Sequence, residues 1–127
     1  MAYLWVALGG ALGSMARYGC AGVASRLFGV TFPYGTLFVN VTGSFTIGVL
    51  ATLSLASDRA LSSTDARAFL IVGVLGGFTT FSSFSYETLS LARTGNVAGA
   101  AMNVALSLVL CLGAVWLGYA TASAFSR

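Results

Sequence analysis

The sequence predicts an all-α integral membrane protein of four transmembrane helices, the third of them broken in mid-span. Of its 127 residues, 57% are hydrophobic and only 7% are charged, whereas a soluble domain carries about 25% charged residues. At roughly 20 residues per span plus short loops, this length accommodates four spans and leaves almost nothing for a water-soluble part. We therefore expect residues 1–127 to form a single four-helix domain within a lipid bilayer.

The first predicted span runs from Tyr3 to Ser25 and is expected to be retained, because no positively charged region precedes it. Gly9, Gly13 and Arg17 are spaced by four residues and therefore share one face of the helix. The glycine pair is typical of a close helix–helix contact. A charge inside a span is costly. Arg17 therefore either extends to the nearby interface or faces a polar vestibule, and both interpretations stay open.

The second predicted helix follows a short loop, Arg26–Pro33, and covers Tyr34–Ala56. Small and polar residues follow one side of it at spacings of three to five: Thr36, Asn40, Gly43, Ser44 and Gly48. A carboxamide at mid-span needs hydrogen-bond partners, so Asn40 either joins neighbouring helices or lines a pore. We favour the pore, because the small residues beside Asn40 leave room for a permeating species.

A polar loop, Ser57–Arg67, precedes the third helix, which we place at Ala68–Leu91. Ser63 or Thr64, together with Asp65, is expected to cap its N-terminus. Glycine costs about 1 kcal/mol in a helix and threonine is restricted at χ1, so we expect the helix to break at Gly76 and to resume near Phe81. The sequence of this stretch is Gly76-Gly77-Phe78-Thr79-Thr80-Phe81-Ser82-Ser83-Phe84.

A break at this depth leaves backbone amides and carbonyls without partners in hydrocarbon, which is costly for each group. Such a break is stable where it lines a cavity or binds an ion, as in the discontinuous helices of transporters. Carbonyls freed near Gly76 suit a cation. Phe81 and Phe84, at i and i+3, share one face of the resumed helix, and their electropositive ring edges can meet a small anion. The same spacing is also typical of ordinary packing.

The fourth predicted helix spans Val97–Phe125. Asn103, Ser107 and Cys111 fall at i, i+4 and i+8 and form a polar track on an otherwise apolar cylinder. Hydrogen bonding between helices and a role in a pore both explain this track. Cys20 and Cys111 have no metal-ligand spacing, and we interpret them as small buried hydrophobic residues.

The arginines are divided almost evenly between the two sides of such a four-span chain. One side holds Arg59, Arg67 and Arg127, and the other holds Arg26 and Arg93, with Arg17 close to it. A chain without a positive-inside bias can insert either way up. We therefore predict dual topology. We also predict an antiparallel homodimer, because four helices of this length are too few to enclose a pathway alone.

The chain lacks the groups that enzymatic schemes need. It has no histidine and no lysine, and its only acids are Asp58, Asp65 and Glu87. No thiol lies beside a base, so acid–base, nucleophilic and metal-hydrolytic catalysis are not expected. The arginines form no basic patch, which argues against nucleic-acid binding.

Three kinds of membrane protein could be built from these groups. A small dual-topology proton-coupled multidrug exporter needs a carboxylate within a span, and the only candidate, Glu87, is better explained as an interfacial residue. A pore-forming lysis protein does not require the specific polar groups that this chain carries at mid-span. Hydroxyls and amides can replace the hydration shell of a small ion without titrating. A cation bound near Gly76 would offset the cost of an anion nearby, so a channel or passive conduit fits best.

The stretch from Gly76 through Ser85-Tyr86-Glu87 resembles the third-helix signature of the fluoride channel family called Fluc or CrcB. Similar segments are Gly9-Gly10-Ala11-Leu12-Gly13 with Arg17-Tyr18, and Pro33-Tyr34-Gly35-Thr36-Leu37 leading to Asn40-Val41-Thr42-Gly43. The resemblance covers three of the four helices, and the fourth matches mostly in character. It implies an antiparallel homodimer in the inner membrane of a prokaryote that exports fluoride passively, without ATP or proton coupling.

The resemblance also implies roles for individual residues. A central sodium ion would be held by the backbone carbonyls of Gly76 and Thr79 of each subunit. Arg17 would lie in the vestibule. The fluoride pathway would be lined by Asn40, Phe81, Phe84, Ser82 and Ser83, joined by Asn103 and Ser107 of the fourth helix. Some relatives carry a tyrosine where this chain has Asn103.

Overall fold

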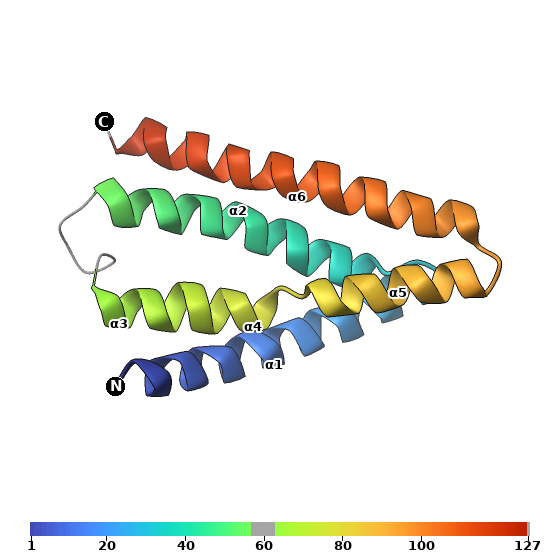
Figure 1. Ribbon diagram of the computed structural model, residues 1–127, viewed down its shortest axis with the longest axis horizontal. Coiled ribbons are helices and arrows are strands. Elements are labelled where there is room, and N and C mark those ends of the chain that lie inside the picture. The colour runs from blue at the N-terminus through green and yellow to red at the C-terminus, as the bar shows by residue number, and fades with distance from the viewer. Residues whose placement is uncertain (57–62, 127) are drawn as a thin grey trace.

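The computed structural model describes residues 1–56 and 63–126, which form four long helical rods and no strand within those ranges (Figure 1). Three rods are α1 (Ala2–Phe28), α2 (Tyr34–Ala56) and α6 (Val97–Phe125). The third rod along the chain is built from α3 (Thr64–Arg67), η2 (Ala68–Leu75), α4 (Gly76–Phe78) and α5 (Phe81–Arg93). The predicted all-α, four-helix layout with a broken third helix is thereby confirmed, and the second and fourth helices have the predicted bounds.

Three of these helices are long and apolar enough to cross a membrane: Tyr34–Leu55, Thr64–Arg93 and Val97–Phe125. The chain is therefore a multi-pass membrane protein. α1 is 27 residues long and reaches beyond both predicted bounds of the first span, and its crossing of the bilayer stays a prediction. The N-terminal end of α1 and the C-terminal end of α6 lie at the same end of the molecule (Figure 1).

The charges at the helix ends follow the expected division where the structure describes them. Arg67 lies at the start of the third rod, whereas Arg26 and Arg93 lie in the last turns of α1 and α5, at the other end. Arg59 and Arg127 lie outside the described residues.

The third rod begins at Thr64, four residues before the predicted start at Ala68. Ser63 is extended and its hydroxyl accepts a hydrogen bond from the Ala66 amide at 3.2 Å, which confirms it as the N-cap, with Asp65 in the first turn. Because the cap is at Ser63, the polar residues Thr64–Arg67 are part of the helix rather than of the loop before it. The eight residues that follow, Ala68–Leu75, are wound as a π-helix, a wider form that is frequent at functional sites.

The break lies at Thr79 and Thr80, so the predicted position at Gly76 is wrong. Thr79 (φ −85°, ψ 157°) and Thr80 (φ −155°, ψ 117°) are extended, whereas Gly76 is helical (φ −63°, ψ −36°). Gly77 is helical too, and a Cβ there would overlap the carbonyl oxygen of Gly10 on α1. The double glycine therefore includes a residue that serves helix contact, and the two threonines carry the unwound backbone.

α1 and the first half of the third rod approach each other through glycines on both sides. A Cβ at Gly9 would overlap the carbonyl oxygen of Phe69, and one at Gly13 would overlap that of Val74. Gly73 lies against Gly9 in the same way. This close contact confirms the packing surface predicted from the Gly9–Gly13 spacing.

α2 and α6 form a second close pair and run in the same direction (Figure 1). Gly48 lies against the backbone of Val115, and Gly118 lies against the backbone of Phe45. Because backbone faces backbone at both points, the level of one helix relative to the other is fixed. The second half of the third rod, α5, then packs beside α6.

We expect Gly13→Ala to destabilise the fold. The added Cβ would overlap the Val74 carbonyl oxygen and approach the Phe78 amide nitrogen to 2.8 Å, and backbone atoms cannot move aside as a side chain can. Overpacking of this kind costs about 1–3 kcal/mol. The measurement is unfolding of the purified protein in detergent, followed by circular dichroism.

Gly10→Ala is the matched control, because a Cβ at Gly10 meets nothing within 4 Å. It should unfold at the wild-type midpoint or above it, since alanine is the better helix former by about 1 kcal/mol. Equal behaviour of the two variants would contradict the proposed contact.

Candidate functional site

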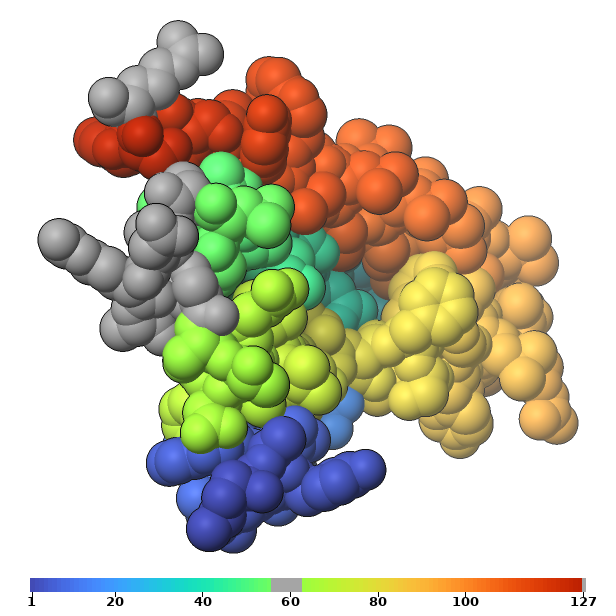
Figure 2. Space-filling model, turned by 60° about the vertical axis from the view of Figure 1, so that its left-hand side comes forward, coloured from blue at the N-terminus to red at the C-terminus, as the bar shows by residue number. Residues whose placement is uncertain are grey.

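A cavity of about 390 Å³ opens at the level of the break, between α2, η2, α5 and α6. Figure 2 shows this face of the molecule hollowed between α5, α6 and the first half of the third rod, with part of α2 visible deeper in. None of the residues that line the cavity carries a charge. It brings together six of the residues predicted for the fluoride pathway and the sodium ion: Asn40, Gly76, Thr79, Phe81, Phe84 and Ser107.

Asn40 holds the break from α2 through two hydrogen bonds to one residue. Its Nδ2 donates to the Thr80 carbonyl oxygen at 3.0 Å, and its Oδ1 accepts from the Thr80 amide at 2.8 Å. The carboxamide thus pairs with both backbone groups of an extended residue, as a neighbouring strand would. Asn40 both lines the cavity and joins two helices, so the two interpretations of this residue from sequence are compatible.

Thr80 also starts the helix that follows the break. Its hydroxyl accepts from the Ser83 amide at 3.2 Å and lies 3.2 Å from the hydroxyls of Ser82 and Ser83. Thr80 is 8% exposed and therefore buried in the protomer. Ser82 and Ser83, predicted beside the fluoride path, belong to a hydroxyl cluster around the cap of α5. The sequence identifies Thr80 as a poor helix former at the break but not as the cap of the helix that follows.

The carbonyls of Gly76 and Thr79 are among those that lose their helical partners at the break. In a continuous helix the Gly76 carbonyl would accept from the Thr80 amide, but that amide donates to Asn40. The Thr79 carbonyl would accept from the Ser83 amide, but that amide donates to the Thr80 hydroxyl. The side chains of Asn40 and Thr80 thus divert the amides that would otherwise occupy the two carbonyls predicted as cation ligands.

The two phenylalanines after the break lie together at the cavity. The Phe81 and Phe84 ring centroids are 5.2 Å apart with planes at 51°, a tilted arrangement. Phe81 is 75% exposed in the single chain, so its ring lies mostly outside the protomer. Gly43 of α2 makes room for the Thr79 side chain, because a Cβ at Gly43 would overlap the Thr79 methyl group.

The polar track on α6 divides into two parts. Asn103 is 1% exposed and its Nδ2 donates to the Thr88 hydroxyl of α5 at 2.9 Å, so it joins two helices. Ser107 and Cys111 line the cavity instead. Helical spacing placed the three on one face, but it could not show that this face meets α5 at one level and the cavity at the next.

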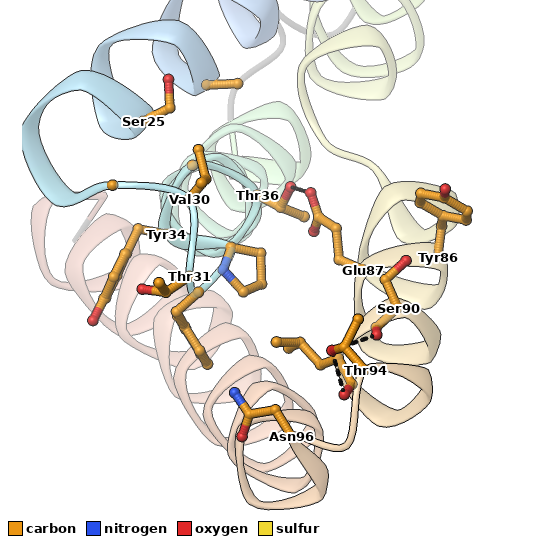
Figure 3. Close-up of a pocket in the computed structure, with 16 residues that line it drawn as sticks. Ser25, Val30, Thr31, Tyr34, Thr36, Tyr86, Glu87, Ser90, Thr94 and Asn96 are labelled. Atoms are coloured by element: carbon orange, nitrogen blue, oxygen red, sulfur yellow. Dashed lines mark hydrogen bonds between the residues drawn. The ribbon is translucent and has the colours of Figure 1, made fainter.

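A second cavity, of about 580 Å³, lies at the end of the bundle where α1 joins α2 and α5 joins α6 (Figure 3). There the Thr36 hydroxyl donates to Oε1 of Glu87 at 2.7 Å, while Oε2 of Glu87 is buried without a hydrogen-bond partner. Figure 3 shows the Thr36 and Glu87 side chains pointing toward each other. Arg17 is half-buried on α1 and lines neither of the two cavities.

Comparison with known proteins gives one family. The model of the family described as "CrcB-like protein, Camphor Resistance (CrcB)" matches residues 4–119. A protein of Opitutus terrae is 56% identical over 120 residues, which are 94% of this chain and 91% of that protein. Proteins of Methylocella silvestris (47% identical, 100% of this chain and 97% of that protein) and Thermus thermophilus (56%, 92% and 91%) are also similar. All three carry the name "Fluoride-specific ion channel FluC".

We expect Asn40→Asp to destabilise the fold by about 1–3 kcal/mol. An ionised aspartate can still accept from the Thr80 amide, but it cannot donate to the Thr80 carbonyl oxygen, and it places a negative oxygen beside it. Thermal unfolding in detergent measures the loss.

Asn96→Asp serves as the matched control, because Asn96 acts only as an acceptor when it caps α6 through the Gly99 amide at 2.8 Å. Aspartate caps equally well and is favourable at a helix N-terminus. If Asn40→Asp unfolds together with Asn96→Asp, then the donation to Thr80 contributes nothing to the fold.

Proposed function

The chain belongs to the CrcB family, and from this premise we propose that it is a fluoride-selective channel that exports fluoride passively from the cytoplasm. The names of its relatives, at up to 56% identity, support fluoride as the permeating ion. The observation in this chain that supports a channel most directly is the mid-span cavity lined by uncharged residues.

The cavity offers an anion hydrogen-bond donors and partial positive charges in place of the water molecules that it loses. Asn40 uses one of its two Nδ2 hydrogens for Thr80, and the other is available as a donor. Ser107 adds a hydroxyl, and the edges of the Phe81 and Phe84 rings carry partial positive charge. These groups stabilise an anion without titrating, so transport through them needs no proton.

The carbonyls of Gly76 and Thr79 fit the sodium ion that the family resemblance implies. Both oxygens have lost their helical amide partners, and a backbone carbonyl is a suitable ligand for a hard cation. Gly76 is exposed, with only the Ile71 carbonyl oxygen within 4 Å of where its Cβ would lie. When bound, the ion supplies a fixed positive charge that lowers the cost of an anion nearby.

We further propose that two copies associate in antiparallel orientation. Phe81 is 75% exposed and Gly76 is open at the middle of the third rod, so a second copy packed there would cover both. The nearly even division of arginines supports insertion in either direction. The location proposed for the dimer is the inner membrane of a prokaryote.

The alternative, a proton-coupled multidrug exporter, has less support. Such a mechanism needs a carboxylate where the substrate binds. The mid-span cavity has none, and Glu87 lines the second cavity at the bundle end instead.

The first test is fluoride efflux from proteoliposomes, recorded with a fluoride-selective electrode. We expect the wild-type protein to release fluoride rapidly, with chloride retained and no dependence on a proton gradient. Phe81→Ile should abolish this efflux, because the branched side chain has no electropositive ring edge. Phe38→Ile is the matched control: Phe38 is 55% exposed on α2 and lines neither cavity, so its replacement should leave efflux intact. Wild-type efflux from Phe81→Ile would contradict the pathway.

A second test uses the two native cysteines, both of which are free and half-buried. Cys111 lines the mid-span cavity, whereas Cys20 on α1 does not line it. Mercury(II), which replaces the thiol proton and adds a bulky group, should inhibit fluoride efflux of the wild-type protein and of Cys20→Ser. Cys111→Ser should be resistant. Inhibition of Cys111→Ser to the wild-type extent would show that this cavity is not on the route.

A further inference from the structure

Hydroxyl side chains in the helices of this protein mostly bond to their own helix. On α2 the hydroxyls of Thr42, Thr46 and Thr52 donate to the carbonyl oxygens of residues 38, 42 and 48, at 2.6, 2.8 and 2.7 Å. Thr79, Ser85, Thr88 and Thr121 do the same elsewhere. A hydroxyl bonded in this way has given its only proton to the backbone and cannot donate to an ion.

Ser44 and Ser107 depart from this pattern. Within the described ranges, neither hydroxyl makes a hydrogen bond, and both residues line the mid-span cavity. Ser107 is 9% exposed, so most of the residue is covered by the protomer. Each of the two hydroxyls keeps an unused proton in a cavity whose lining is otherwise mostly apolar. The cavity therefore suits an occupant that accepts hydrogen bonds.

The two serines lie on α2 and α6, and the close glycine contacts between these helices fix how far one is shifted along the other. Gly48 of α2 lies against Val115 of α6, and the two helices run in the same direction. A Cβ at Gly48 would meet both the Val115 carbonyl oxygen and the Tyr119 amide nitrogen, so Gly48 lies midway between these two residues in height. Ser44, one turn before Gly48, is then at about the height of Gly113, and Ser107 lies nearly two turns before Gly113 on α6. The free hydroxyls thus face one cavity from two helices, at successive heights.

The remaining polar groups indicate the charge of the occupant. Asn40 is the nearest amide on α2, and its oxygen already accepts from the Thr80 amide while one Nδ2 hydrogen stays available. Apart from the carbonyls of Gly76 and Thr79, which we assign to the cation, the cavity thus offers one amide hydrogen and two hydroxyl protons as donors. A small anion can accept hydrogen bonds from these donors in turn as it moves along the cavity.

We propose that Ser44 is a further fluoride-coordinating residue, which extends the donors of Asn40 and Ser107 along the mid-span cavity. This inference rests on the proposed channel function and adds a residue to it. Fluoride that has lost its water accepts from the Ser107 hydroxyl at one height of the cavity and from the Ser44 hydroxyl at another. A chain without the Ser44 hydroxyl would leave the ion short of a donor at that height.

The test compares Ser44→Ala with Thr46→Ala in proteoliposomes. Ser44→Ala should lower fluoride efflux about tenfold or more, as expected for the loss of one hydrogen bond to a charged group, and should raise the fluoride concentration that gives half-maximal flux. Thr46→Ala removes a hydroxyl that donates to the Thr42 carbonyl oxygen on the same helix and should conduct as the wild type does. Size-exclusion chromatography checks that both variants are assembled.

The outcomes separate this inference from the channel function. If the wild type and Thr46→Ala conduct fluoride and Ser44→Ala conducts equally well, with the same half-maximal concentration, the role of Ser44 is overturned while the channel stands. If the wild type conducts no fluoride, the proposed function fails and this inference with it. Should Ser44→Ala fail to assemble, Ser44→Cys decides: its weaker donor should give reduced flux, and wild-type flux would overturn the proposal.

Discussion

The middle of this protein depends on two hydrogen bonds between the Asn40 carboxamide and the backbone of Thr80. An extended residue at membrane depth has no water to satisfy its amide and carbonyl, and Asn40 satisfies both from the neighbouring helix. With Thr80 held in this way, its hydroxyl can cap α5. The bond to Asn40 diverts the Thr80 amide from the Gly76 carbonyl, and the Thr80 hydroxyl diverts the Ser83 amide from the Thr79 carbonyl. Two side chains, Asn40 and Thr80, therefore stabilise the break and leave these carbonyls without their helical partners.

The glycine contacts put this interaction at a defined depth. α1 lies against the first half of the third rod through Gly9, Gly13 and Gly73, and α2 lies against α6 through Gly48 and Gly118. Backbone contacts at these points allow little sliding, because a shift would bring side chains into the positions that only glycine can occupy. The two helix pairs therefore hold their helices in a defined register, and the side chains that line the cavity between them are placed by that register.

Much of the fold could be predicted from the sequence, because apolar length and caps are local signals: α2 and α6 have the predicted bounds, and the cap of α3 is Ser63, one of the two residues predicted for it. The position of the break could not, since the low helix propensity of Gly77 says nothing of the carbonyl of Gly10 packed against it. Within the site, Asn40 was identified from its type and depth, but its partner lies 40 residues away. The antiparallel dimer and the sodium ion concern contacts beyond one chain and stay predictions.

We propose that the break presents the carbonyls of Gly76 and Thr79 to a cation. Anomalous diffraction from crystals in which thallium(I) replaces sodium tests this claim most directly, because thallium scatters strongly and accepts the same oxygen ligands. We expect one anomalous peak in contact with both carbonyl oxygens, and we expect it to be absent from crystals of Asn40→Asp. Wild-type crystals with no peak at these oxygens, or with a peak bound elsewhere in the protein, would contradict the account.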